Sequence, residues 1–151
     1  MTVQVRTNEE RKPLILDGGI GYRKGGQTIT QDASRTADLV NGTVMAQKVA
    51  DQEWVPFTDL TATDGSAIPR GIYLGPDIAF ATLVAGDVDN AVILVGGSVK
   101  FDQDLITLEN SLTLNSVLAT GTIHSRRVED ALAELGLFAG EGEDISSFEN
   151  S

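Results

Sequence analysis

The feature that most constrains the fold is a series of short apolar runs, broken by turn residues, that begins at Leu39. Asn41-Gly42 is a strong tight-turn dipeptide, and Asp64-Gly65 is another. Short runs rich in valine, isoleucine and threonine between such turns are typical of strands. The sequence therefore predicts a mostly β protein, folded as a compact β-rich sandwich or barrel-like domain.

The expected strands either alternate in polarity or are continuously apolar. They are Thr43–Val49, Trp54–Thr58, Gly71–Leu74, Ala79–Leu83, Ala91–Val95 and Ser98–Phe101. Ala91–Val95 is the most apolar of them, so we expect it to cross the middle of the core. Pro56 marks an edge strand or a bulge. We interpret Gly86–Asn90 as a loop and assign no element between Asp102 and Thr122.

One segment has a helical period near the C-terminal end. Val128, Ala131, Leu132 and Leu135 recur at i, i+3, i+4 and i+7. Ser125 is a suitable N-cap, and Gly136 is a suitable left-handed residue after the last turn. These signals predict one short C-terminal helix around residues 125–135. Its apolar stripe must dock on the sheet, because so short a helix is marginal in isolation.

The first 35 residues differ from the rest in glycine content and charge. Five glycines lie within Gly18–Gly26, which excludes a helix and disfavours a stable central strand. The segment also holds six of the eleven lysine and arginine residues. We interpret residues 1–35 as an extended, glycine-rich N-terminal arm, 36–138 as the β-rich domain, and 139–151 as an acidic tail that is predicted to be disordered.

The net charge of −11 argues against nucleic acid as a partner, because such affinity depends on neutralising phosphates with lysine and arginine. Two interpretations of the uneven charge remain open: a solvated surface, or a mildly cationic arm that seeks an acidic protein partner. The apolar runs are much shorter than the ~20 residues of a membrane helix. The N-terminal segment lacks the apolar core of a secretory signal, so we expect a protein that is made in the cytoplasm and has no membrane partner.

Groups that could carry catalysis are few in this sequence. The chain has no cysteine, which excludes disulfides, thiolate metal sites and cysteine nucleophiles. His124 is the one histidine, and no Gly-x-Ser-x-Gly elbow accompanies it. Its place just before the predicted helix suits a polar surface or capping role. The residues predict a protein that is not an enzyme, although a small hydrolase based on His124 remains an alternative.

Three weaker motifs point to no cofactor or metal. Gly19-Ile20-Gly21 does not open a helix, as a dinucleotide-binding motif requires. Asp87-Val88-Asp89 resembles the start of a calcium loop but lacks its sixth-position glycine and its closing acid. Asp102, Asp104 and Glu109 could pair for glycoside chemistry, but scattered carboxylates in an acidic chain are more often simply solvated.

Seven short motifs follow one another between Gly42 and Leu137. They are Gly42-Thr43-Val44, Trp54-Val55-Pro56-Phe57, Asp64-Gly65, Gly71-Ile72-Tyr73-Leu74, Val92–Val95, Gly97-Ser98-Val99 and Leu135-Gly136-Leu137. In this order they resemble the head-decoration (cement) proteins of tailed phages, of the lambda type. The resemblance covers about two-thirds of the chain. The chain departs from the family in its longer glycine-rich region before Gly42 and in its acidic tail after Phe138.

The resemblance implies a viral structural protein of compact β-rich fold that assembles as a homotrimer. It implies that the trimer lies on the exterior of the expanded capsid in the virion, where the N-terminal arm reaches the major capsid protein and stabilises the head. An alternating arm is suited to adding a strand to an exposed sheet edge. The predicted capsid-binding residues are Val3, Val5, Arg6, Arg11, Lys12, Leu14 and Ile15.

A generic β-sandwich module that binds carbohydrate or peptide is the alternative function. A carbohydrate site of this kind would need exposed aromatic side chains on one groove. The candidates are Trp54, Phe57 and Tyr73.

Overall fold

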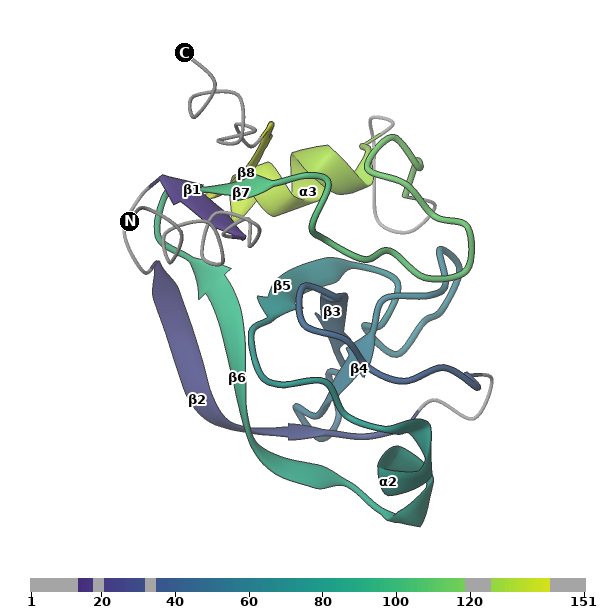
Figure 1. Ribbon diagram of the computed structural model, residues 1–151. Coiled ribbons are helices and arrows are strands. Elements are labelled where there is room, and N and C mark those ends of the chain that lie inside the picture. The colour runs from purple at the N-terminus through teal and green to yellow at the C-terminus, as the bar shows by residue number, and fades with distance from the viewer. Residues whose placement is uncertain (1–13, 18–20, 32–34, 119–125, 142–151) are drawn as a thin grey trace, which may run out of the picture.

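The computed structural model of the chain describes residues 14–17, 21–31, 35–118 and 126–141. The elements within these ranges are β1 (Ile15–Asp17), β2 (Tyr22–Ile29), β3 (Val44–Gln47), β4 (Trp54–Pro56), β5 (Pro69–Tyr73), α2 (Phe80–Ala85), β6 (Val88–Gly96), β7 (Val99–Asp102), α3 (Val128–Glu134) and β8 (Leu137–Gly140) (Figure 1). The fold is mostly β, as predicted.

Five strands form a closed barrel in the order β2-β4-β3-β5-β6. Most neighbours are antiparallel, and the parallel contact between β2 and β4 is limited to Ile29 opposite Trp54. In β3, Val44, Met45 and Ala46 are all buried, so this strand is covered on both faces instead of alternating. Ile93 and Leu94 of β6 are also fully buried. The prediction that Ala91–Val95 crosses the core is confirmed.

The other three strands form a small sheet in the order β1-β7-β8. β1 is antiparallel to β7, and β8 is parallel to it. Parallel neighbours need a long crossover, and here residues 103–136 supply it and include α3. The core is continuous between barrel and sheet, because Phe101 and Leu137 of the sheet share one apolar cluster with Ile72 and Leu94 of the barrel.

Helix α3 confirms the predicted C-terminal helix. Val128, Ala131 and Leu132 are buried, so the apolar stripe docks as expected. The Asp130 carboxylate accepts a hydrogen bond from the Arg127 backbone N–H at 3.0 Å, which satisfies one orphan donor of the first turn. Gly136 follows the helix with φ of +87°, the conformation that glycine adopts most readily. The predicted N-cap, Ser125, lies outside the described residues.

Helix α2 corrects the strand that was predicted over Ala79–Leu83. Its first turn is capped from a distance: the Asp38 carboxylate accepts the Phe80 backbone N–H at 2.7 Å. Leu83 is its buried residue and packs in a second apolar cluster around Trp54 and Tyr73. The loop predicted at Gly86–Asn90 is correct only for Gly86 and Asp87, since β6 already begins at Val88. Neither helix in the described ranges is long and apolar enough to cross a membrane.

Strand β2 corrects the prediction that the glycine-rich segment forms no stable strand. Tyr22–Ile29 pairs with β6, and the register shifts between Lys24 and Gln27, where Gly26 has φ of +65°. The glycines are thus accommodated at an irregularity of a paired strand. Part of the predicted 1–35 arm therefore belongs to the barrel, and β8 continues to Gly140, past the predicted start of the tail. Residues 1–13 and 142–151 lie outside the described ranges.

Candidate functional site

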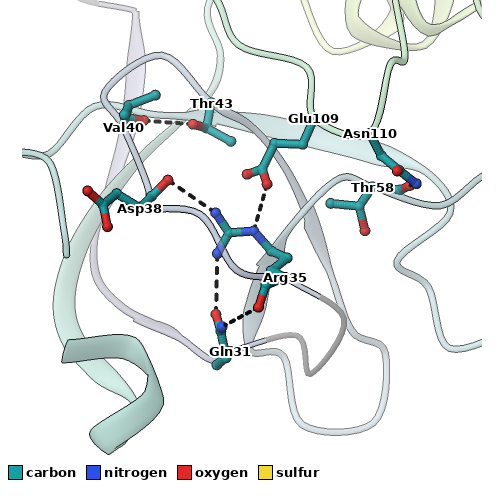
Figure 2. A network of polar contacts seen from close by, with 8 residues as sticks. All are labelled: Gln31, Arg35, Asp38, Val40, Thr43, Thr58, Glu109 and Asn110. Atoms are coloured by element: carbon teal, nitrogen blue, oxygen red, sulfur yellow. Dashed lines mark hydrogen bonds and ion pairs between the residues drawn. The ribbon is translucent and has the colours of Figure 1, made fainter. Parts of the chain in front are cut away.

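A buried arginine joins the segment before β3 to the long connection after β7. The Arg35 side chain is 2% exposed, and its Nε donates to the Glu109 carboxylate at 2.8 Å. Its two terminal nitrogens donate to the Gln31 side chain at 3.2 Å and to the Asp38 carbonyl at 3.3 Å. Figure 2 shows the guanidinium between these partners. A hollow of about 230 Å³ adjoins the network. Because Arg35 is held by groups of its own chain, the network ties the segment before β3 to the long connection after β7.

The three carboxylates considered for glycoside chemistry lie in different surroundings. Asp102 is fully buried, and one of its oxygens accepts the Asp104 backbone N–H at 2.9 Å. Among the described residues, the other oxygen of Asp102 has no hydrogen-bond partner. Asp104 is exposed, and Glu109 is paired with Arg35. Asp102 is thus buried, Asp104 is solvated and Glu109 is neutralised by Arg35. The three carboxylates therefore do not form the matched pair that glycoside hydrolysis uses.

The other weak motifs also have structural roles. Val88 and Asp89 lie in β6, and the Asp89 carboxylate accepts a hydrogen bond from the Thr28 hydroxyl at 2.9 Å. Burial and the nearby carboxylates of Asp51 and Asp87 raise the pKa of Glu53. Within the described ranges, no group of three or more acidic or histidine side chains is arranged to hold a metal ion. Gly21 leads into strand β2 rather than into a helix. Gly19, Ile20 and His124 lie outside these ranges.

The aromatic residues proposed for a carbohydrate groove are all inside the protein. Trp54 and Tyr73 are 2% exposed, and Phe57 is fully buried. The indole N–H of Trp54 donates to the Gln27 side chain at 2.9 Å. The Tyr73 hydroxyl donates to the Pro76 carbonyl at 2.6 Å. The carbohydrate-binding alternative requires these three rings to be exposed on one groove, and their burial does not meet that requirement. The sequence pattern indicated the segments that hold the rings but not the face that each ring would occupy.

Burial of Tyr73 predicts that the protein loses stability at alkaline pH. Burial, with a smaller contribution from the Asp77 carboxylate, raises the pKa of the Tyr73 hydroxyl above its ordinary value of 10.0. Above about pH 10 the unfolded chain therefore releases this proton before the folded chain does. The folded state then holds more protons than the unfolded state, so the free energy of unfolding falls as the pH rises. Urea unfolding between pH 8 and pH 11 measures this decline.

Tyr73→Phe is the matched variant for this prediction. It removes the titrating group and the hydrogen bond to Pro76, so its stability should be lower at pH 8 but should decline less steeply toward pH 11. In a Tyr22→Phe background, absorbance at the phenolate band follows Tyr73 alone. A Tyr73 that ionises at or below pH 10 in the folded protein would contradict the prediction.

The predicted capsid-binding residues are divided by the boundary of the described ranges. Val3, Val5, Arg6, Arg11 and Lys12 lie outside it. Leu14 and Ile15 are half-buried and pack against the main core. Ile15 lies opposite Phe101 in β7, and the Leu14 carbonyl accepts the Asp102 backbone N–H at 2.7 Å. These two residues therefore help to attach β1 to the sheet.

The exposed surface has one feature that the sequence did not indicate. Residues Tyr22–Gly26 of β2 are all exposed, although they belong to a paired strand. The Tyr22 side chain is 72% exposed, more than any other large apolar side chain in the described ranges. The glycines favoured a loop-like arm at this point, and pairing with β6 could not be inferred from them.

Comparison with known proteins adds no relative to this picture. A scan against protein-family models found no match to the chain, and a search of curated proteins found no significant match.

Proposed function

We propose that the chain is a head-decoration protein of a tailed phage, which binds the outer surface of the expanded capsid as a homotrimer and stabilises the head. The observation that carries the proposal is the order of the motifs between Gly42 and Leu137. Those motifs coincide with elements of the fold: the second lies on β4, the fourth on β5, and the last joins α3 to β8. They thus lie on strands and junctions that define the domain.

The position of β1 supports an attachment that begins near the N-terminus. β1 is an edge strand of the small sheet, so the chain before Leu14 starts from an edge and not from the centre of the fold. The thirteen residues before Leu14 can span at most about 45 Å when fully extended. That length is enough to reach a neighbouring protein. Alternation at Val3 and Val5 suits strand addition, in which backbone hydrogen bonds supply the affinity.

Stabilisation of the head follows from binding linkage. A ligand that binds the expanded shell and not the disrupted one shifts the equilibrium toward the shell. Ordering of an arm costs conformational entropy, so a single arm binds weakly. Three arms on one trimer raise the avidity by roughly 10²–10⁴-fold without a new contact on any arm.

The structure sharpens the truncation that tests this proposal. Deletion of residues 2–13 spares β1, whereas deletion of 2–16 would also remove Leu14 and Ile15 from the core. We expect the 2–13 deletion to fold, to keep its oligomeric state and to lose binding to expanded capsids in co-sedimentation. The capsids are those of the phage whose genome carries this gene, where a neighbouring major capsid protein gene is expected.

Deletion of residues 142–151 is the control, because it is another terminal truncation and should leave capsid binding intact. Light scattering of the full chain should give a mass three times 16.0 kDa. Capsid binding that survives the 2–13 deletion would move the attachment away from the arm. Failure of the intact chain to bind expanded capsids would overturn the decoration proposal itself.

A further inference from the structure

A small hollow lies where the connection from β5 to α2 meets the first half of β6. This β6 hollow has a volume of about 180 Å³. Its walls are mostly apolar and include Tyr73, Pro76, Ile78, Val88, Ala91 and Val92. Helix α2 joins the two walls, and Figure 1 shows it beside the start of β6. An apolar cavity of roughly 150 Å³ takes up benzene, so the β6 hollow has room for one leucine- or phenylalanine-sized side chain.

The β6 hollow opens to solvent at an irregularity in its strand. Asp89 and Asn90 line the hollow and are exposed. The register between β2 and β6 shifts at these residues, and Asn90 has φ of +62°. Strand irregularities of this kind re-aim side chains, and strained backbone is concentrated where proteins hold ligands. The amide of Asn90 can both donate to and accept from the backbone of a bound peptide.

Two carboxylates give the opening its charge. Asp89 lines the hollow, and the exposed Asp77 lies between two lining residues in the chain. Their hydrogen bonds come from uncharged donors: Asp77 accepts the Asn41 backbone N–H at 2.9 Å, and Asp89 accepts the Thr28 hydroxyl at 2.9 Å. Neither carboxylate forms an ion pair with a cation of the described part of the chain, so both charges remain uncompensated there.

Volume and charge together select the occupant. A negative opening above an apolar hollow favours a segment in which one apolar side chain is flanked by lysine or arginine. The same charge disfavours the body of a second copy, because most of the cations of this chain lie in its first 35 residues and most of its acids lie after them.

We propose that the β6 hollow binds a segment of a partner protein, which inserts one leucine- or phenylalanine-sized side chain and places neighbouring lysine or arginine residues against Asp77 and Asp89. A buried apolar anchor of this kind supplies most of the affinity of an interface. The cations at the rim supply specificity and speed association. The hollow belongs to the barrel and not to the small sheet that holds β1, so the proposal goes beyond the decoration proposal and does not rest on it.

The probe is a fluorescein-labelled peptide in which one leucine stands between two Lys-Arg pairs. We expect the full chain to bind this peptide saturably in fluorescence anisotropy. Replacement of the peptide's leucine by glycine should weaken binding by about tenfold or more, because the hollow is then left without its anchor. A peptide with glutamate in place of lysine and arginine should not bind.

The variant Asp77→Asn/Asp89→Asn tests the rim. Asparagine removes both charges but keeps a side-chain oxygen that can accept the hydrogen bonds of the fold. We expect the leucine peptide to bind about fivefold more weakly, the effect of losing two exposed charge pairs. Asp59→Asn/Asp104→Asn is the matched control, since it makes the same change at two exposed aspartates that line other hollows. The control should bind as the wild type does, and circular dichroism checks that both variants are folded.

Methyl NMR of the full chain locates the bound anchor. Ile78 and Val88 line the β6 hollow, whereas Ile106 lines a separate hollow in the connection after β7. The leucine peptide should shift the methyl resonances of Ile78 and Val88 and leave those of Ile106 unchanged.

Five results would overturn the proposal. They are no binding of the leucine peptide up to roughly 1 mM; equally tight binding of the glycine peptide; equal weakening in both double variants; methyl shifts that spare Ile78 and Val88; and binding that appears only after deletion of residues 2–13, which would identify the N-terminal segment of this chain as the occupant.

Discussion

Replacement of Arg35 by methionine is expected to lower the free energy of unfolding by about 3–5 kcal/mol, the usual cost of breaking a buried ion pair from one side. The Glu109 side chain is 15% exposed and would remain without its guanidinium partner, and the Gln31 side-chain oxygen and the Asp38 carbonyl would each lose a donor. Urea denaturation followed by Trp54 fluorescence measures the loss.

A double-mutant cycle distinguishes the cost of an orphaned charge from the loss of packing. Replacing both partners, in Arg35→Met/Glu109→Leu, removes the unpaired carboxylate, so this variant should recover a large part of the lost stability. Arg35→Lys should fall between the wild type and Arg35→Met, because lysine keeps the charge but lacks the planar fork that reaches three partners. A loss below 1 kcal/mol for Arg35→Met would show that the pair is effectively solvated.

The parts of the fold that were predicted correctly are those specified by local sequence. Ala91–Val95 is continuously apolar, and only a strand or helix buried on both sides accommodates such a run. The stripe of α3 and the glycine at position 136 give both the face and the end of that helix. Pro56 was expected at an edge strand or a bulge. It is the last residue of β4, and the pairing of β4 with β2 is limited to Trp54 and does not include the proline.

The parts that were missed depend on partners distant in the chain. The cap of α2 comes from Asp38, 42 residues before Phe80, and no local signal indicates it. Strand β2 exists because β6 pairs with it, and this pairing overrides the low strand propensity of Gly25-Gly26. Tertiary contacts of this kind cannot be read from a single sequence.

The same distinction holds for the candidate site residues. Strand patterns identified the segments that contain Trp54, Phe57 and Tyr73, but closure of the barrel decides that these rings point inward. Ile15 was assigned to a binding arm because a charged and glycine-rich sequence surrounds it. Its half-buried position against the core reflects pairing with Phe101, which is 86 positions away in the chain. Leu14 and Ile15 therefore belong with the small sheet.

Replacement of Phe101 by alanine is expected to destabilise the protein by about 3–5 kcal/mol, the range for removing a buried phenylalanine. Phe101 is fully buried in the middle strand of the small sheet, opposite Ile15 on one side and Ala139 on the other. It also belongs to the cluster shared with the barrel, so its loss opens a cavity where the two sheets meet. For a chain of this size the change corresponds to a fall in melting temperature of about 6–20 °C.

Phe138→Ala is the matched control for Phe101→Ala, because it removes the same side chain from the neighbouring strand. Phe138 lies opposite Lys100 in β8 and is 46% exposed, so its removal should change stability by about 0.5 kcal/mol or less. Phe101→Leu should cost less than Phe101→Ala, since leucine fills more of the space. Calorimetry of the three variants measures the differences.

Equal losses for Phe101→Ala and Phe138→Ala would contradict the burial of Phe101 and the joining of barrel and small sheet through one core. A large loss confined to Phe101→Ala would also mean that β1 is fixed by the core, so that any attachment by the N-terminal arm starts from an anchored strand.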